Sequence, residues 1–123
     1  MSAGPEDILQ MQVARFLKIA APDLLWFHPA NGGYRNPREA KKLKDMGVRP
    51  GVPDLAFVLP GGMSAFIELK AGKNGLQPSQ KDFAQQATEA GSAWQVCRSL
   101  EEVESTLRAW GVALKATVSH IKS

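Results

Sequence analysis

The stretch PGVPDLAFVLPGGMSAFIELKAG, residues 50–72, constrains the possible folds more than any other part of the chain. Two apolar runs, DLAFVL and SAFIELKA, lie on either side of a turn-forming Pro-Gly-Gly connection. This pattern is typical of an antiparallel β-hairpin. Three charged residues, Asp54, Glu68 and Lys70, interrupt the apolar runs. Because a charge is costly to bury alone, these three residues need either one another or a ligand.

The register of the hairpin decides whether the three charges can meet. Side chains at positions i and i+2 of a strand share a face, so Glu68 and Lys70 project side by side, about 7 Å apart. A strict two-residue glycine turn would pair Asp54 with Leu69 and place its side chain on the opposite face. A loop with an odd number of residues, or a bulge, pairs Asp54 with Glu68 or Lys70 instead. We predict this odd register.

Two carboxylates and an ammonium at one point suit hydrolysis of a phosphodiester. Carboxylate oxygens are hard ligands for Mg²⁺ or Mn²⁺, and a metal ion there polarises the phosphate and lowers the pKa of a bound water. The Lys70 ammonium could neutralise a phosphate or hold the attacking water. An ion pair of Lys70 with Glu68 or Asp54 explains the same spacing, because charge clusters also occur for structural reasons. The spacing alone therefore leaves both interpretations open.

Hydrophobic periodicity predicts the elements around the hairpin. Residues 111–123 have weak periodicity, and we assign them no element. The order of the other elements is α-β-α-β-β-α-β-α, which predicts an α/β domain. The elements other than the hairpin strands are an amphipathic helix over residues 6–20, a strand over 24–28, a helix from a capping box at Asn36 to Gly47, a helix from Pro78 to Gly91, a strand over 93–98, and a helix from a capping box at Ser99 to about Trp110.

Length and composition bound the class of protein. The chain has 123 residues, of which 44% are hydrophobic, which suits one domain with one core. No apolar run approaches the ~20 residues needed to cross a bilayer, and the N-terminus lacks a signal-peptide pattern. We therefore expect a soluble, cytoplasmic protein with no membrane partner. The single cysteine, Cys97, lies in an apolar strand, and we expect it to be structural.

Two residues outside the hairpin could assist the charged cluster. Glu6 lies seven and eleven residues before Val13 and Leu17, so it falls on the apolar stripe of the first helix. An inward carboxylate favours a cation, although an acid in the first helical turn also interacts well with the helix dipole. Gln80 lies in the first turn of the helix after the hairpin, where its amide could orient a water or simply be solvated.

Basic side chains gather between residues 34 and 50. Six basic and two acidic residues give this segment a net charge of +4, whereas the whole chain carries +3. Such a patch favours a polyanionic partner, although a solvated helix face would give the same pattern. The six basic residues are Arg35, Arg38, Lys41, Lys42, Lys44 and Arg49.

The spacing of these residues resembles that of a known superfamily. Pro53-Asp54, thirteen further residues and then Glu68-Leu69-Lys70 resemble the motif of the PD-(D/E)XK nucleases. The segments GVRPGVPDLAF, FIELKAGKNGLQPSQ and WFHPANGG further resemble the VRR-NUC (virus-type replication-repair nuclease) family, in particular its small stand-alone members from phages and bacteria. The resemblance covers about residues 6–110, so we expect residues 1–123 to form a single VRR-NUC nuclease domain.

The resemblance implies a restriction-endonuclease-like fold, with a central mixed four-stranded sheet flanked by helices in an αβββαβ core. It implies an endodeoxyribonuclease that depends on a divalent metal, Mg²⁺ or Mn²⁺. Asp54 and Glu68 would be metal ligands, with the backbone carbonyl of Leu69 as a third oxygen. Lys70 would position the water or stabilise the charge that develops on the phosphate.

Further positions match the family in the same way. Glu6 matches the acid of the N-terminal helix, which binds the metal directly or through water, and Gln80 matches the glutamine of the helix after the Glu-x-Lys strand. His28, Asn31 and Gly32 match the loop after the first strand, near the substrate. His28 could equally be an ordinary strand-end histidine. The expected DNA-binding set is His28, Asn31, Lys73 and the six basic residues of the 34–50 segment.

The resemblance also suggests a substrate and an assembly. Stand-alone family members resemble Holliday-junction resolvases, so we expect a homodimer that cuts branched DNA such as four-way junctions during DNA repair and recombination. The alternative is a non-catalytic nucleic-acid-binding module that retains the nuclease fold. A third interpretation is a protein-interaction domain that uses the tryptophan-containing C-terminal segment.

Overall fold

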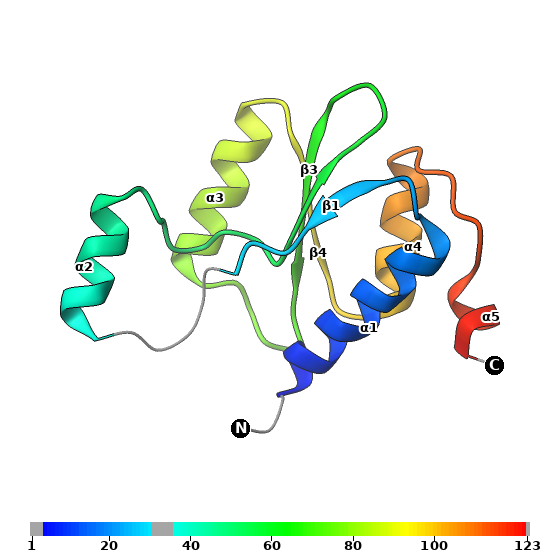
Figure 1. The fold of residues 1–123 in the computed structure, drawn as a ribbon, viewed down its shortest axis with the longest axis horizontal. Coiled ribbons are helices and arrows are strands. Elements are labelled where there is room, and N and C mark those ends of the chain that lie inside the picture. Colours follow the sequence, from blue (N-terminus) through cyan, green and yellow to red (C-terminus); the bar gives the residue numbers. More distant parts are fainter. Residues whose placement is uncertain (1–3, 31–35, 123) are drawn as a thin grey trace.

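The computed structural model describes residues 4–30 and 36–122 and contains one mixed sheet (Figure 1). The four strands follow one another across the sheet in chain order. The first three pair antiparallel, and the fourth runs parallel to the third. The predicted α/β architecture, a mixed four-stranded sheet flanked by helices, is confirmed. The strands are β1 (Leu25–Phe27), β2 (Leu55–Val58), β3 (Ser64–Leu69) and β4 (Ala93–Cys97).

Helices cover both faces of the sheet. Helices α1 and α4 pack on one face and α3 lies against the other, while α2 stands apart from the sheet (Figure 1). Each predicted helix is present, with ends within a few residues of those expected. None of the helices in the described part of the chain is long and apolar enough to span a membrane. The helices are α1 (Pro5–Ala20), α2 (Pro37–Asp45), α3 (Pro78–Glu89), α4 (Leu100–Ala109) and α5 (Val118–Lys122).

Side-chain caps account for two of the helix starts. The Asn36 side-chain oxygen accepts a hydrogen bond from the Glu39 N–H at 2.8 Å. The Ser99 hydroxyl accepts one from the Glu102 N–H at 3.1 Å. Each bond satisfies an amide that has no partner within its own helix. The N-cap bond of each predicted capping box therefore forms.

The C-terminal segment returns to the body of the domain. The Lys115 N–H donates to the Ala20 carbonyl at 2.8 Å, which joins this segment to the end of α1. Val118, at the start of α5, is only 2% exposed. Five residues are too few for helical periodicity to show in the sequence, which is why this element was not predicted.

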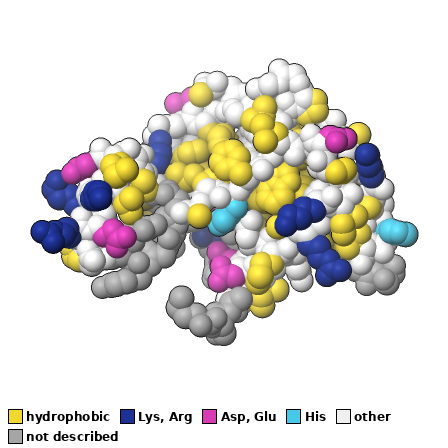
Figure 2. All heavy atoms as spheres, viewed as in Figure 1, with side chains coloured by type: hydrophobic (Ala, Val, Ile, Leu, Met, Phe, Trp, Pro, Cys, Tyr) yellow, Lys and Arg dark blue, Asp and Glu magenta, His cyan; other side chains and the backbone are white. Residues whose placement is uncertain are grey.

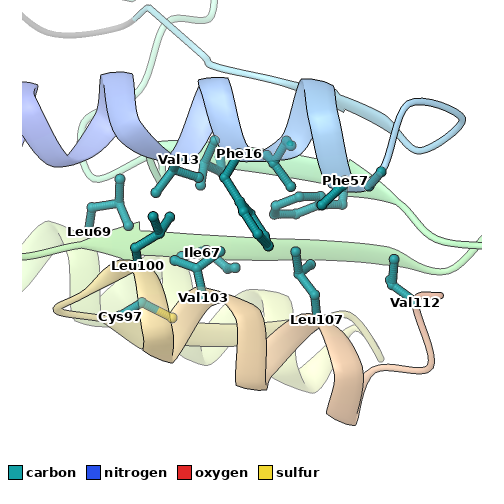
Figure 3. Packing of buried hydrophobic residues seen from close by; sticks show 14 of the residues in the cluster. Val13, Phe16, Phe57, Ile67, Leu69, Cys97, Leu100, Val103, Leu107 and Val112 are labelled. Carbon is teal, nitrogen blue, oxygen red and sulfur yellow. The ribbon is translucent and has the colours of Figure 1, made fainter. Parts of the chain in front are cut away.

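The main core lies between the sheet and the α1/α4 pair (Figure 3). Phe16 of α1 and Leu107 of α4 meet Ile67 of β3 there, each at most 1% exposed. Burying a side chain of this size contributes roughly 1.5–3 kcal/mol. Cys97 belongs to the same cluster, and burial raises the pKa of its thiol to about 11. A thiol with so high a pKa is unreactive, as expected for a structural cysteine.

The other face of the sheet is covered only in part. Phe66 of β3 packs edge to face on Phe83 of α3, with 5.1 Å between ring centroids. Over β1 and β2 this face is bare, and three neighbouring apolar side chains are 41–62% exposed there. We call this group, Leu25, Phe27 and Val58, the bare apolar patch.

The hairpin has the odd register that the sequence predicts. Leu55 pairs with Ile67, and the pairing continues without a break to the end of β2. The Leu59 N–H donates to the Met63 carbonyl at 2.8 Å, so the loop between them has three residues, 60–62. Its two glycines have φ of +94° and +90°, which other residues rarely adopt. Extended by one pair, this register places Asp54 opposite Glu68.

Candidate functional site

Asp54 and Glu68 lie together on the α3 side of the sheet. Glu68 is only 4% exposed, and a hydrogen bond links its side chain to that of Asp54. The Asp54 carboxylate also accepts a hydrogen bond from the Leu69 N–H at 2.7 Å, which fixes Asp54 against β3. The N–H and C=O of one strand residue point to the same side, so the Leu69 carbonyl is also directed toward Asp54. The Asp54 carboxylate, the Glu68 carboxylate and the Leu69 carbonyl, all possible ligands for a cation, are therefore directed toward one another at the end of the hairpin.

The environment of Glu68 disfavours its charged form. Its pKa is raised from an ordinary value of 4.5 to about 8, first by burial and then by the negative charge of Asp54 and the hydrogen bond between the two side chains. Glu6 raises it further, whereas the positive charge of Lys70 lowers it. A buried carboxyl group next to a second carboxylate keeps its proton unless a cation compensates the two negative charges. The pair therefore has the electrostatics of a cation site.

Lys70 lies two residues after Glu68, on the same face of the chain, and is only 6% exposed. Within residues 4–30 and 36–122, its ammonium takes part in no hydrogen bond or ion pair. A buried charge without a close partner costs several kcal/mol. The Lys70 ammonium therefore favours an added anion that can accept its hydrogen bonds.

Gln80 connects the carboxylate pair to α3. Its side-chain N–H donates to Glu68 Oε2 at 3.2 Å, while its side-chain oxygen accepts from the Gln77 N–H at 2.8 Å. Because both ends of the amide have partners, its orientation is fixed. Gln80 therefore holds Glu68 and does not face solvent as first-turn glutamines usually do.

The loop before Asp54 packs against the start of the same helix. Gly51 has φ of +81°, and a Cβ atom there would lie 2.2 Å from the Ser79 carbonyl oxygen. Only glycine fits so close an approach of two backbones. Pro53 is fully buried next to Asp54. This packing explains why the apolar strand begins with the sequence Gly-Val-Pro-Asp.

His28 and Glu6 approach the site from two other elements. The His28 Nδ1 hydrogen-bonds the Asp54 backbone carbonyl at 2.6 Å, so His28 holds the loop that carries Asp54. Glu6, in the first turn of α1, is half-buried and accepts a hydrogen bond from the Asn74 side chain at 3.3 Å. Its charge reaches Glu68, as the raised pKa of Glu68 shows.

The donor set suits a hard divalent cation. In the described part of the chain, no three His, Cys, Asp or Glu side chains lie close enough to enclose a metal ion. The site instead offers two carboxylates and a backbone carbonyl directed the same way, all of them oxygen ligands. Mg²⁺ and Mn²⁺ bind in this manner, with waters or substrate oxygens completing the coordination. Glu6 stands outside this group, which suits contact through a water molecule.

A hollow of about 460 Å³ opens at the carboxylate pair. Four of its residues were expected at the site: Asp54, Glu68 and Gln80 in the charged cluster, and His28 near the substrate. Asp7 lines it as well, although sequence reasoning did not select it. Asp7 looked like an ordinary first-turn acid, and its side chain does accept a bond from the Gly4 N–H at 3.3 Å.

The predicted DNA-binding residues lie in different parts of the structure. Helix α2 has no buried residue, and Lys and Arg side chains gather around it at the left of Figure 2. Lys73 is exposed on the loop after β3. Asn31, Gly32 and Arg35 lie outside the described residues. The basic residues of α2 are Arg38, Lys41, Lys42 and Lys44.

Arg49 differs from these residues because it contacts α3. Its guanidinium lies 3.4 Å from the Asp82 carboxylate and 5.2 Å from the centre of the Phe83 ring. It also donates to the Gln86 side chain at 3.5 Å. These contacts attach the segment that follows α2 to the body of the domain.

Comparisons with known proteins identify the family. The family model of the VRR-NUC domain matches residues 34–101, which is more than half of the chain. The chain therefore belongs to the VRR-NUC domain family, a family of nuclease domains. A search of curated proteins finds no significant match.

Two solved structures share the fold. One, described as a "VRR_NUC domain protein", has a TM-score of 0.67 and 22% sequence identity, over 92% of this chain and 93% of that one. Another, described as a "VRR_NUC domain", has a TM-score of 0.60 and 23% identity, over 88% of this chain and 99% of that one.

Proposed function

We propose that this chain is a divalent-metal-dependent, structure-selective DNA endonuclease that cuts branched DNA such as four-way junctions. The observation that carries the proposal is the half-buried Asp54 next to the buried Glu68, with the buried Lys70 ammonium beside them. Family membership supports nuclease chemistry. We further propose one nuclease domain over residues 1–123, with a core over about 6–110, acting in the cytoplasm of bacterial or phage-infected cells.

Each residue at the end of the hairpin has a proposed role. Asp54, Glu68 and the Leu69 carbonyl would hold Mg²⁺ or Mn²⁺, with Glu6 reaching it through a water. When bound, such an ion polarises the phosphate and lowers the pKa of a water molecule. Gln80 and His28 hold Glu68 and Asp54 in place through the hydrogen bonds described above.

Lys70 would act on the substrate. Its ammonium is buried and free to donate hydrogen bonds to a phosphate oxygen or to the attacking water. Charge builds up on the phosphate in the transition state, and a fixed cation stabilises that charge more than it stabilises the ground state. Loss of Lys70 should therefore affect turnover more than binding.

DNA recognition would depend on phosphate contacts from α2. Its lysines and its arginine are exposed, and the helix stands away from the sheet, where it can follow a backbone beyond the cut site (Figure 1). Phosphate contacts carry little sequence information and weaken with salt. Selection of DNA by shape fits this arrangement better than selection by sequence.

A symmetrical four-way junction needs two cuts, and each chain has one site, so we propose that the protein works as a homodimer. The bare apolar patch supports this assembly. Large apolar side chains that cluster on a surface commonly mark an interface, and Leu25, Phe27 and Val58 carry no charge that would oppose a second copy.

Cleavage of matched DNA substrates tests the proposal. Four-way, flapped and linear DNA should be incubated at moderate salt with Mg²⁺ or Mn²⁺ and with the wild type, Asp54→Ala or Lys70→Ala. We expect the wild type to cut the four-way junction fastest, and both variants to bind it without cutting. Equal cutting by all three proteins would refute the site. Binding without cutting by the wild type would indicate a non-catalytic binding module.

A further inference from the structure

We infer that Arg98 is a positioning residue of the metal site, which acts on Glu6 through the loop that follows β3. The inference rests on the proposed function, because it assumes that Asp54 and Glu68 bind a metal ion. Arg98 lies directly after β4 and is exposed. No sequence motif predicts a role for Arg98.

Arg98 holds the loop by its backbone. One guanidinium nitrogen, Nη1, donates to the Gly72 carbonyl at 2.9 Å and to the Asn74 carbonyl at 2.7 Å. The Asn74 N–H donates to the Ala71 carbonyl at 3.3 Å, which closes a turn between these positions. Hydrogen bonds from a charged donor are stronger than neutral ones. Two of them on one short turn fix its conformation.

The same turn carries the side chain that contacts Glu6. The Asn74 amide donates to Glu6 Oε2 at 3.3 Å, across 68 positions of sequence. Glu6 lies in the first turn of α1, two residues after the Gly4 cap, where a helix is least constrained by its own hydrogen bonds. The turn held by Arg98 therefore supplies Glu6 with a fixed partner.

The position of Glu6 matters for cation binding. Asp7, the next residue of α1, lines the same hollow as Asp54 and Glu68. Asn74, which bonds Glu6, lies in the loop directly after the strand that carries Glu68. Glu6 is therefore close enough for its charge to act on Glu68, and a shift of Glu6 changes the negative potential at the carboxylate pair. Hydrogen-bonding partners of metal-site residues commonly affect metal affinity by 10- to 100-fold. Because Arg98 acts through two intermediates, we expect an effect at the lower end, roughly 10-fold.

Titration of Mn²⁺ tests the inference without any DNA. Free Mn²⁺ gives a paramagnetic resonance signal that falls when the ion is bound. We expect Arg98→Ala and Asn74→Ala to weaken Mn²⁺ binding by roughly 10-fold. Arg108→Ala is the matched control, because Arg108 is also an exposed arginine but pairs with Glu104 within α4 at 2.9 Å. This control should bind Mn²⁺ as the wild type does.

A second pair of variants separates positioning from general stability. In a Glu6→Gln background, Arg98→Ala should cause no further loss of Mn²⁺ affinity, because its effect passes through Glu6. Thermal melting of each variant without metal shows whether it is folded. If Arg98→Ala weakens Mn²⁺ binding equally in the wild-type and Glu6→Gln backgrounds, the inference is wrong. It is also wrong if a folded Arg98→Ala protein binds Mn²⁺ with wild-type affinity.

The same titration distinguishes failure of the inference from failure of the proposed function. Asp54→Asn and Glu68→Gln should abolish high-affinity Mn²⁺ binding. If they do so while Arg98→Ala has no effect, the proposed function stands and the inference alone is wrong. If they leave Mn²⁺ binding intact, the proposed metal site itself is wrong.

Discussion

The two faces of β3 have opposite properties. One face presents Ala65, Ile67 and Leu69 to α1 and α4, and all three are at most 1% exposed. The other face presents Phe66 to α3 and then Glu68, followed by Lys70 just beyond the strand. Successive residues of one strand thus contribute alternately to the core and to the site.

This difference shows how a small domain can hold buried charges. The apolar face provides the free energy that stabilises the sheet, so the opposite face can keep a carboxyl group whose charged form is disfavoured there. Buried charges at such a site are a cost to folding that the ligand removes. Substitutions on the two faces should therefore change different quantities.

Glu68→Gln should give the largest effect. The change keeps the size of the side chain but removes a metal ligand, so we expect cleavage to fall about 10³-fold or more. Stability without metal at pH 7 should stay the same or rise, because a buried acid is removed. Single-turnover cleavage and chemical denaturation of the same sample check the two expectations. A variant that cuts normally would remove Glu68 from the site.

Ile67→Ala, at the position next to Glu68, should have the opposite effect from Glu68→Gln: it should reduce stability and leave metal binding unchanged. Removing a fully buried side chain leaves a cavity, and we expect the free energy of unfolding to fall by about 2–5 kcal/mol. The folded fraction should still bind Mn²⁺ with wild-type affinity, because Ile67 faces away from the site. Urea denaturation and Mn²⁺ titration measure the two quantities. A large loss of metal affinity in folded protein would show that the faces are coupled.

The pH dependence of stability should also originate on the charged face. The pKa of Glu68 is about 8 in the folded chain, against an ordinary value of 4.5, so the folded state binds more protons between these values. The free energy of unfolding without metal should therefore decrease as the pH rises from about 4.5 to 8. Glu68→Gln should remove this contribution. Denaturation with a chelator across this range tests it, and an unchanged slope in the variant would contradict it.

A substitution in the bare apolar patch, which lies on the same face of the sheet as Glu68, should have a smaller effect than the changes above. Phe27 is 54% exposed, so Phe27→Asp should leave stability within about 0.5 kcal/mol of the wild type. If the patch joins two chains, the aspartate should convert the dimer to a monomer. Sedimentation velocity distinguishes the two states, with Met11→Asp as a control, because Met11 is equally exposed on α1 at 57%. A dimer that survives Phe27→Asp would place the interface elsewhere.

The smallest effect concerns the helix that stands apart from the sheet. The logarithm of the DNA-binding constant falls linearly with the logarithm of the salt concentration. Lys42→Ala should make this slope shallower by about 0.9, the value for one phosphate contact. Arg49→Ala should change this slope less, because Asp82 already partners its charge. Binding at several salt concentrations measures both slopes. Equal changes would mean that Arg49 also binds phosphate.

Local sequence patterns predicted most of the fold. Apolar periodicity located the helices and strands, and the cap at Asn36 marked the start of α2. Parity showed that Asp54 shares a face with Glu68 and Lys70 only in an odd register, and it left open which of the two lies opposite Asp54. The structure has this odd register. These features depend on residues near one another in the chain, or on a hairpin whose loop fixes its register.

The remaining features depend on contacts between distant segments. Asn74 meets Glu6, and Arg49 meets α3, through packing that no local pattern encodes. Asp7 has the same appearance in the sequence as any acid at a helix start. The role of Arg98 becomes visible only when its contacts with two carbonyls are seen. The roles of the site residues in catalysis remain predictions.

Calorimetry of Mn²⁺ binding at pH 7 tests the central claim most directly. Most Glu68 side chains carry a proton at this pH, since their pKa is about 8, and a metal ion must displace it. Titrations in two buffers with different ionisation enthalpies count the protons released. We expect close to one proton for each Mn²⁺ bound to the wild type, and no high-affinity binding to Glu68→Gln. Equal binding by Glu68→Gln would contradict the metal site, and binding without proton release would contradict a protonated Glu68 in the metal-free site.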